Sequence, residues 1–473
     1  MLIKFGTSGW RDIIADGFTF ENVRICAQAI CDHLKGIGDA REVIVGSDAR
    51  FMSSHFMKVA SEVFAGNGIK VYFCVRDTPT PVISYEILRR KLSGGINFTA
   101  SHNPPEYQGL KFSPSWGGPA LPETTQDIEK RANELFKSGK KVSRIDFDEA
   151  VKAGKIEKID PMDPYLKRMK ELIKFDEIKK AKMKILVNPL YGTSRGYLDK
   201  LLKEAGCDVT IMNDHTDPYF GGLPPEPSEE YIPDMIEEMK KGGYDLGLAT
   251  DGDADRFGVL GKGGKFFEAN QILGMLLKHL KLTRPEWKGG VARSVATTQL
   301  IDAVAKKYGI EVFETPVGFK FVGDLISKDK IIMGGEESAG MSMKGHVPEK
   351  DGILACLLVA EMVAMVKKPL EEILKELYEE VGTYLTKRIN FRLTEAEKAK
   401  AIEHLKKDPK EVAGFKVEKV VRIDGTKCVL ENGAWILVRF SGTEPVVRFY
   451  AEARSEDVLQ KLCSEGEKFV KGN

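Results

Sequence analysis

The sequence predicts an α/β protein made of three similar α/β domains with mixed sheets and a smaller C-terminal α+β domain. Three observations lead to this fold class. The chain has 473 residues, which is too many for one hydrophobic core. Short apolar runs typical of buried strands alternate with helical patterns in three successive groups, and strand patterns dominate the final segment.

Each of the three groups contains strand patterns separated by helical patterns. We expect strands at 43–46, 70–74 and 95–99 in the first group, at 185–188, 208–212 and 244–249 in the second, and at 289–294, 311–314 and 330–333 in the third. The order of elements repeats without a close repeat of sequence. Residues 155–163 are expected to form a connector, and the Lys-rich stretch 167–184 the first helix of the second group.

A different style of sequence marks the C-terminal part. Residues 367–390 are expected to link it to the rest of the chain, and helices flank strands expected at 416–423, 427–431, 434–439 and 446–453. The domains are therefore expected at 1–152, 153–256, 257–368 and 369–473. Each of the four carries at least one polar motif.

Composition argues against several classes of protein. The formal net charge is +1, which argues against nucleic acids and anionic membranes as partners. No apolar segment follows a basic stretch near the start and no run of about eighteen apolar residues occurs, so we expect neither export nor a membrane span. The seven cysteines are scattered and form no C-x-x-C pair, as is typical of reduced cytoplasmic thiols, and the seven histidines show no metal-ligand spacing.

The sequence TASHNPP at 99–105 presents one serine hydroxyl, that of Ser101, between small or turn-forming residues and ends in two prolines. His102 and Asn103 offer hydrogen-bond donors to an anionic group. Lys111 can bring a positive charge back to the serine. This composition predicts an exposed phosphoacceptor; the alternative is a turn serine that serves local hydrogen bonding only.

The sequence DGDADR at 251–256 follows an alternating apolar run that suits a strand. Its small residues allow a tight turn, so that three carboxylates can converge on one hard cation such as Mg²⁺, whereas in a merely solvated turn they would repel one another. An EF-hand also begins D-x-D-x-D, but it would need Gly in place of Arg256 and Glu in place of Lys262. The three carboxylates belong to Asp251, Asp253 and Asp255.

The sequence RFSGTEP at 439–445 lies between two apolar runs, the second of which contains another arginine. A glycine amide, two hydroxyls and arginine forks together suit a phosphate cradle. An ordinary hairpin turn is the alternative, because S-G-T is common turn chemistry. The donors expected in the cradle are Arg439, Ser441, Gly442, Thr443 and Arg448.

The sequence GGEESAG at 334–340 follows an apolar run and places two acids and a serine between glycines. A carboxylate in a site that otherwise favours phosphate needs hydrogen-bond donors, and sugar hydroxyls supply them. Taken alone, this stretch is also compatible with an exposed turn.

Together with GTSGWR at 6–11, these motifs resemble those of the α-D-phosphohexomutase family, the phosphoglucomutases and phosphomannomutases. The resemblance covers the whole chain and keeps the order of all its motifs. It implies four domains around a central cleft that holds the active site. It also implies a role in carbohydrate metabolism, the interconversion of phosphosugars through phosphorylated Ser101 and a 1,6-bisphosphate.

The resemblance further implies roles for single residues. One Mg²⁺ per chain is expected to bind a phosphoserine oxygen together with the three aspartates, and glucose 1,6-bisphosphate is expected as activator and intermediate. The residues expected at the reacting centre are Ser101, Arg11, His102 and Lys111, with Lys111 or His102 as general acid/base. Those expected to bind the sugar are Glu336, Ser338 and Arg256. The alternative for Arg256 is to orient the metal loop, but we favour a contact with the sugar. The cradle around Arg439 and Arg448 is expected to bind the phosphate that does not react.

Smaller clues bear on the sugar. The sequence TPVGFK at 315–320, with Gly318 and Phe319, and HVPEKDG at 346–352 resemble the glucose-phosphate branch. In the latter, Lys350 matches a substrate-binding lysine of phosphoglucomutases; the alternative is a surface lysine. Mannose-capable bacterial enzymes carry G-E-x-S-G-H, and so, more often than not, do phosphoglucosamine mutases, whereas this sequence lacks the motif. We therefore expect a phosphoglucomutase, with a dual phosphoglucomutase/phosphomannomutase or a phosphoglucosamine mutase as alternatives.

The motifs supply what phosphoryl transfer requires, namely positioning and cationic stabilisation of a loose transition state. A C-terminal domain that closes over the sugar would exclude water. Three alternatives remain. A phosphatase would need an activated water, which no motif places, and a bisphosphate synthase would use the same loops. A non-catalytic sugar-phosphate sensor is expected to have lost Ser101 or an aspartate. We expect phosphosugars as partners, a cytoplasmic location, and a monomer or homodimer.

Overall fold

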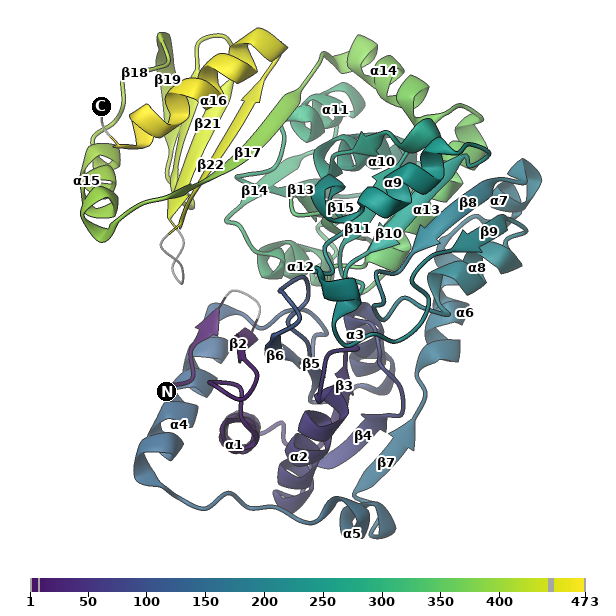
Figure 1. The fold of residues 1–473 in the computed structure, drawn as a ribbon, viewed down its shortest axis with the longest axis vertical. Helices are drawn as coiled ribbons and strands as arrows, with labels where there is room; N and C mark the ends of the chain where they lie inside the picture. The colour runs from purple at the N-terminus through teal and green to yellow at the C-terminus, as the bar shows by residue number, and fades with distance from the viewer. Residues whose placement is uncertain (1, 7–8, 441–445, 472–473) are drawn as a thin grey trace. The chain divides into compact units, whose positions relative to one another are not determined.

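The computed structural model describes residues 2–6, 9–440 and 446–471 (Figure 1). Its strands form sheets of seven, five, four and six strands, which confirms the predicted α/β architecture with a smaller C-terminal domain. The chain divides into two compact units: Met1–Ala269 with Gly318–Gly334 and Ser338–Leu370, and Asn270–Val317 with Gly335–Glu337 and Glu371–Asn473. Among the described residues, no helix is both long and apolar enough to cross a bilayer.

The first sheet has the order β1-β2-β6-β5-β3-β4-β7. Strands β5, β3, β4 and β7 run parallel, and β6 runs antiparallel to both β5 and β2. The strands are β1 (Phe5–Gly6), β2 (Gly9–Ile13), β3 (Glu42–Ser47), β4 (Lys70–Cys74), β5 (Gly94–Phe98), β6 (Tyr107–Pro114) and β7 (Ile156–Ile159). The accompanying helices are α1 (Phe20–Gly36), α2 (Ser53–Gly66), α3 (Thr80–Arg90), α4 (Pro122–Ser138) and α5 (Phe147–Lys152). Every residue of β5 is buried, as its apolar run predicts.

The second sheet has the order β12-β11-β10-β8-β9, with β10, β8 and β9 parallel and β11 antiparallel to β10. Its strands are β8 (Lys184–Asn188), β9 (Asp208–Ile211), β10 (Leu246–Thr250), β11 (Phe257–Leu260) and β12 (Phe266–Phe267). Its helices are α6 (Met162–Leu172), α7 (Phe175–Ala181), α8 (Leu198–Glu204) and α9 (Pro233–Lys240). Strand β10 is fully buried. The loop at 251–256, called the acidic loop below, follows its carboxyl end, where α/β sheets bind ligands.

The third sheet has the order β14-β13-β15-β16. Its strands are β13 (Gly290–Ser294), β14 (Val312–Thr315), β15 (Ile331–Glu336) and β16 (Gly340–Met343). The helices of this part of the chain are α10 (Ala269–Thr283), α11 (Leu300–Tyr308), α12 (Phe319–Ser327), α13 (Gly352–Val366) and α14 (Leu370–Val381). Helix α13 is apolar on all sides and is therefore buried, and Asp351 caps it by accepting a hydrogen bond from the Leu354 amide at 2.9 Å.

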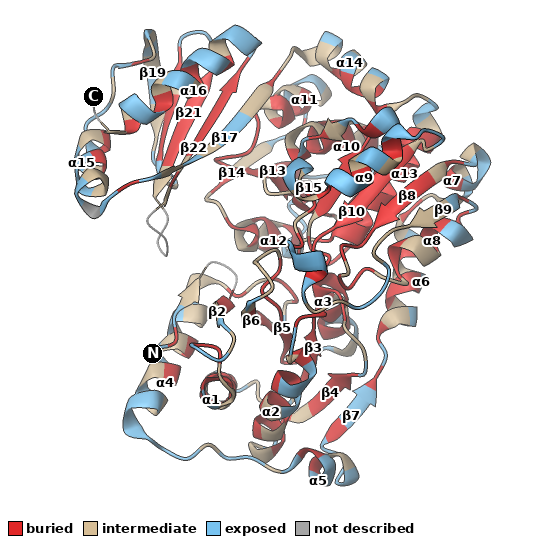
Figure 2. Ribbon diagram, viewed as in Figure 1, coloured by how far each residue is buried: buried red, intermediate tan, exposed pale blue. Residues whose placement is uncertain are grey.

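The C-terminal sheet is antiparallel throughout, in the order β17-β22-β21-β20-β19-β18. Its strands are β17 (Leu385–Arg392), β18 (Glu411–Val412), β19 (Phe415–Val421), β20 (Thr426–Leu430), β21 (Trp435–Phe440) and β22 (Val446–Ala453), and its helices are α15 (Glu395–Lys406) and α16 (Glu456–Lys471). Helix α16 packs on β22 and β17. Figure 2 shows that β21 and β22 are largely buried, whereas α15 and α16 expose one side.

Three expectations about connecting segments are wrong. Residues 156–159 form the edge strand β7 rather than a connector, and the stretch at 167–184 is divided between α6, α7 and the start of β8. The expected link at 367–390 contains α14 and most of β17. In β7 the two isoleucines are buried and the two residues between them exposed, so the run shows neither strand alternation nor a continuous apolar stretch. The first sheet therefore extends past residue 152, and β11 and β12 extend the second past residue 256.

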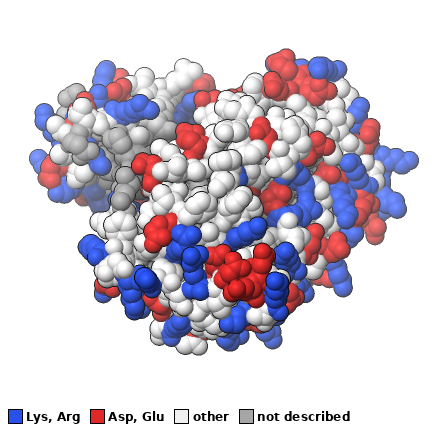
Figure 3. Space-filling model, turned by 60° about the horizontal axis from the view of Figure 1, so that its bottom comes forward, with Lys and Arg blue, Asp and Glu red and all other residues white. Residues whose placement is uncertain are grey.

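Charged side chains of both signs are interspersed on the face shown in Figure 3. No large field of one sign covers that face, in keeping with the net charge of +1. Any attraction of an anionic ligand therefore has to come from local groups.

Candidate functional site

Ser101 lies in the turn that follows β5. Its Oγ donates a hydrogen bond to Oδ2 of Asp251 at 2.7 Å, and Nδ1 of His102 lies 3.3 Å from the same Oγ. The backbone of Ser101 has a φ of +54°, in the left-handed region that residues with a Cβ rarely adopt. Ser101 is only 1% exposed, so the expectation of an exposed serine is wrong: its hydroxyl faces the acidic loop and not solvent.

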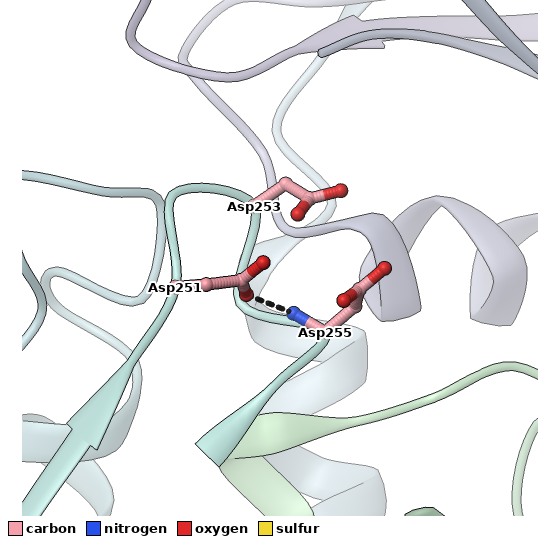
Figure 4. A group of neighbouring side chains, drawn as sticks. All are labelled: Asp251, Asp253 and Asp255. Atoms are coloured by element: carbon pink, nitrogen blue, oxygen red, sulfur yellow. Dashed lines mark hydrogen bonds between the residues drawn. The ribbon is translucent and has the colours of Figure 1, made fainter. Parts of the chain in front are cut away.

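The loop between β10 and β11 brings its three carboxylates together, as the sequence predicts (Figure 4). One oxygen of each lies within 4.8 Å of those of the others, and all three residues are buried. Oδ1 of Asp251 accepts hydrogen bonds from the amide of Asp255 at 2.9 Å and from that of Arg256 at 3.0 Å. Ala254 takes a φ of +58°, which tightens the turn. The acidic loop therefore holds its shape through its own backbone amides.

The donor set of the acidic loop fits a metal ion. Oδ1 of Asp253 and Oδ1 of Asp255 are buried without a hydrogen-bond partner in the described chain. Unpaired buried acceptors are costly, and a hard cation, which prefers carboxylate oxygens, would remove this cost. Burial and the charges of Asp255 and Asp253 raise the pKa of Asp251 well above its ordinary value. The three aspartates can therefore hold a divalent cation.

Two lysines face the three aspartates. Nζ of Lys111, on β6, lies 2.6 Å from Oδ2 of Asp253 and 3.0 Å from Oδ2 of Asp255. Nζ of Lys350 lies 2.6 Å from the same oxygen of Asp255. Burial lowers the pKa of Lys111, but the two carboxylates outweigh it and raise that pKa; burial raises the pKa of Asp255, but the lysines outweigh it and lower that pKa. Lys111 thus contacts aspartates, and Lys350 is not a surface lysine.

Arg11, His102 and Arg256 surround the serine turn. Nη1 of Arg11, on β2, donates to Oδ1 of Asn103 at 2.6 Å, and Nη1 of Arg256 donates to Oε1 of Glu226 at 3.1 Å. Burial and the charges of Arg256 and Arg11 lower the pKa of His102 well below its ordinary value. The imidazole beside Ser101 Oγ is therefore protonated less readily than an ordinary histidine.

The residues expected to bind the sugar occupy two segments. Glu336 is buried at the end of β15, and Ser338 is half-buried in the turn before β16. Gly318 precedes α12 with a φ of +128°, a conformation that requires glycine. Phe319, the first residue of α12, is only 4% exposed, so its side chain belongs to the core.

Arg439 and Arg448 are directly opposite each other on β21 and β22. Like charges in that position destabilise a strand pair unless an anionic group lies between or beside them. Oδ2 of Asp424 accepts from Nη2 of Arg439 at 2.7 Å, and Nε of Arg439 is buried without a partner in the described chain. The other expected cradle residues, Ser441, Gly442 and Thr443, lie outside the described residues.

The sequence did not reveal several residues at these places. Oγ1 of Thr80 donates to Oδ2 of Asp253 at 2.5 Å, and burial raises the pKa of Glu349, next to Lys350, to about 7. A buried ion pair of Asp48 and Arg50 supports the serine turn. Arg388 on β17 is paired with Tyr450 and shares a sheet face with Arg448. Of these residues, only Asp48 and Arg50 could have been identified from the sequence, because they follow the predicted strand at 43–46.

Family models match nearly the whole chain. They are described as phosphoglucomutase/phosphomannomutase alpha/beta/alpha domains I, II and III, at residues 2–138, 163–264 and 268–381, and the C-terminal domain of the same family, at 389–467. A phosphoglucomutase of Komagataeibacter xylinus is 32% identical, with 98% of this chain and 90% of the relative covered. A phosphoglucomutase/phosphomannomutase of Thermococcus kodakarensis is 32% identical with 98% of each covered, and a probable phosphoglucosamine mutase of Thermococcus gammatolerans is 30% identical with 99% of this chain and 98% of the relative covered.

Solved structures show the same fold. A putative phosphomannomutase from Thermus thermophilus matches with a TM-score of 0.86 and 32% identity, over 100% of both chains. The phosphoglucomutase parafusin from Paramecium matches with a TM-score of 0.84 and 23% identity, over 100% of this chain and 96% of that one. The names of these relatives differ in the sugar.

Proposed function

We propose that this chain, which belongs to the phosphoglucomutase/phosphomannomutase family of phosphohexomutases, is a phosphoglucomutase. It interconverts glucose 1-phosphate and glucose 6-phosphate through phospho-Ser101 and glucose 1,6-bisphosphate. Relatives of about equal identity are named for mannose and glucosamine phosphates as well, so dual phosphoglucomutase/phosphomannomutase activity and phosphoglucosamine mutase activity are the alternatives to be tested.

The observation that carries this proposal is the contact of Ser101 Oγ with the acidic loop, 2.7 Å from Asp251. A phosphoryl group on that oxygen would lie beside Lys111 and the aspartates, where cationic groups stabilise charge on the transferring oxygens. In the forward step the sugar hydroxyl bonds to phosphorus, the bond from phosphorus to Ser101 Oγ breaks, and the hydroxyl proton passes to the general base. His102 or Lys111 is that general acid/base, and Arg11 lines the reacting centre.

We propose Mg²⁺ as the ion held by Asp251, Asp253 and Asp255. Their oxygens are the ligands that Mg²⁺ prefers, and two of them have no other partner among the described residues. When bound, the ion would neutralise charge on the phosphoryl oxygens. Lys111 and Lys350, which contact Asp255, would stabilise the same charge on the phosphoryl oxygens.

The bisphosphate has to turn over between the two half-reactions, so the sugar is bound in two orientations. We propose Glu336 and Ser338 as the groups that read its hydroxyls. Lys350, whose Nζ is fixed on Asp255, and Arg256 are proposed at the sugar and its phosphate. The arginine pair of β21 and β22, with the loop at 441–445, is proposed for the phosphate that does not react.

Replacement of Ser101 tests the proposal. We expect Ser101→Ala to lower turnover of glucose 1-phosphate, assayed with Mg²⁺ and a trace of glucose 1,6-bisphosphate, by about 1,000-fold or more, the scale of losing a covalent nucleophile. Binding of the sugar phosphate is expected to persist. The exposed Ser54 provides the control variant Ser54→Ala, which is expected to keep full activity. Near-normal turnover of Ser101→Ala would rule out the phosphoserine route.

A second assay compares the sugars. The wild type is given glucose, mannose and glucosamine 1-phosphates under the same conditions, and kcat/KM is measured for each. A clear preference for glucose supports the proposed specificity. Equal turnover of mannose 1-phosphate would establish dual activity, and a preference for glucosamine 1-phosphate would replace the proposal. We also propose a cytoplasmic location, in keeping with the seven cysteines, which are all free thiols.

A further inference from the structure

Arg50 makes an unusually complete set of hydrogen bonds to the serine turn. Its Nη2 donates to the carbonyls of Ser101 at 2.7 Å and of Asn103 at 2.6 Å. Its Nη1 donates to the carbonyls of Pro104 at 2.7 Å and of Tyr107 at 3.0 Å. One guanidinium therefore holds four carbonyls of the segment 101–107, and its side chain is fully buried.

Asp48 completes the arrangement from the same strand end. Its Oδ2 accepts from Nε of Arg50 at 3.0 Å and from Oγ1 of Thr99 at 2.6 Å. Oγ1 of Thr99 in turn accepts from the amide of Ser101 at 2.8 Å. The amide and the carbonyl of Ser101 are thus both tied to the Asp48–Arg50 pair, which lies at the carboxyl end of β3.

We infer that Arg50 is a positioning residue that holds Ser101 in its left-handed conformation and so directs its hydroxyl to the acidic loop. The inference rests on the proposed role of Ser101. A backbone at φ +54° is unfavourable for serine and persists only when its surroundings fix it. The hydrogen bonds from Arg50 and Thr99 to the two peptide groups of Ser101 do so.

Only arginine can fill this position. All five of its N–H groups are used, one on Asp48 and four on carbonyls, in the planar fork that a guanidinium provides. A lysine has three donors on one nitrogen and leaves carbonyls of the turn unpaired. The side chain of Arg50 contacts only backbone carbonyls of the turn. Loss of Arg50 therefore displaces Ser101 without removing any group proposed to bind the sugar.

Arg50→Lys gives the kinetic test. A misplacement of the reacting group by about 1 Å costs about 100-fold in rate. We therefore expect kcat to fall about 100-fold while KM for glucose 1-phosphate stays within about twofold of the wild type. Arg144→Lys, at an exposed arginine paired with Glu62 in the same domain, is the matched control and is expected to keep both constants. An unchanged kcat in Arg50→Lys would overturn the inference.

Hydrogen exchange gives a test that does not depend on activity. In Arg50→Lys, peptides covering 99–107 are expected to exchange faster than in the wild type and in Arg144→Lys, while other peptides of the first domain do not change. Unchanged exchange at 99–107 would overturn the inference whatever the kinetics. If the wild type turns over none of the sugar phosphates, the proposed function fails, and the exchange result still decides whether Arg50 holds the turn.

Added guanidinium separates positioning from a general loss of stability. Arg50→Gly leaves room for a free guanidinium ion, which can donate to the same carbonyls. We expect millimolar guanidinium to restore part of the kcat of Arg50→Gly and to have no such effect on Ser101→Ala. Failure of guanidinium to raise kcat, in protein whose melting temperature shows it to be folded, would contradict the assignment of Arg50 as a positioning residue.

Discussion

Each aspartate of the acidic loop is held by different neighbours. Asp251 accepts the Ser101 hydroxyl and two backbone amides, Asp253 accepts from Thr80 and Lys111, and Asp255 faces Lys111 and Lys350. The lysines compensate part of the charge, but they leave one oxygen of Asp253 and one of Asp255 unpaired within the described chain. A cation bound there would therefore complete this set of contacts.

Asp253→Asn tests the proposed metal site at the scale of one residue. The amide keeps the shape of the carboxyl group but carries no charge, so we expect the Mg²⁺ concentration for half-maximal activity to rise at least about 10-fold, with a fall in kcat. Activity is measured across a Mg²⁺ titration. Asp214→Asn, at an exposed position outside the loop, is the control and is expected to leave the titration unchanged. A wild-type titration curve for Asp253→Asn would remove this loop from the metal site.

The sequence predicts the convergence of the three aspartates because their spacing is local. The sequence does not predict which positively charged side chains pair with these aspartates. Lys111 and Lys350 reach the same carboxylate of Asp255 from widely separated parts of the chain. Burial of Ser101 is also invisible in a turn composed of small and polar residues. Exposure depends on what packs over a turn, and only the fold determines that.

At the scale of elements, the hairpin of β21 and β22 is anchored at the end opposite to its arginine pair. Trp435 and Glu452 are paired there, and Trp435 Nε1 donates to Oε1 of Glu452 at 2.7 Å. The amide of Gln299 donates to the same carboxylate at 3.1 Å, and Nζ of Lys427 donates to the carbonyl of Val295 at 2.9 Å. The hairpin, through Glu452, and the neighbouring strand β20, through Lys427, are thus attached to the segment that follows β13.

Lys427 is the costly member of this cluster. Its side chain is 1% exposed, and burial together with the charge of Arg293 lowers its pKa to about 8. The unfolded value is about 10.4, so between pH 8 and pH 10.4 the unfolded chain binds more protons than the folded one. Stability therefore rises with pH in that window, and the lysine is fully unfavourable below it.

Lys427→Met removes this titration. We expect the free energy of unfolding of the wild type, relative to that of Lys427→Met, to increase from pH 8 to pH 10 by up to about 1.4 kcal/mol per pH unit. The measurement is chemical unfolding at several pH values. Lys419→Met, at an exposed lysine of β19, is expected to show no such pH dependence. A difference that does not vary with pH would contradict a protonated, desolvated Lys427.

Two strands were predicted closely: β4 coincides with 70–74 and β22 with 446–453. Other strands escaped prediction. Strands β1, β12 and β18 have two residues each, too few for a periodicity, and β6 contains glycine, lysine and glutamine within its run. Such segments are stabilised by pairing with other strands, and a local sequence pattern does not show that pairing.

At the scale of the whole molecule, the chain consists of two compact units. All three aspartates and Ser101 belong to the first unit, whereas the arginine pair of β21 and β22 belongs to the second. The second unit contains residues 270–317 in addition to the C-terminal domain. The buried contacts of Glu452 and Lys427 explain why these two parts form one unit.

Mg²⁺ is expected to stabilise one unit selectively. A ligand that binds only the folded state stabilises it, by about 2.7 kcal/mol at 100 times its dissociation constant. In scanning calorimetry we therefore expect two transitions, of which Mg²⁺ raises only one, and we expect Asp253→Asn to abolish that rise. A single transition, or an equal shift of both, would show that the units do not unfold separately.

The burial of Ser101 bears on how the enzyme acquires its first phosphoryl group. A protein kinase binds its acceptor serine in an extended, accessible segment, whereas Ser101 is 1% exposed in a turn fixed on both sides. On the proposed function, a folded chain is therefore primed only by a small phosphorylated sugar that diffuses into the site. Freshly made enzyme would start with a lag that shortens as the bisphosphate concentration rises, which couples its activity to the supply of its own intermediate.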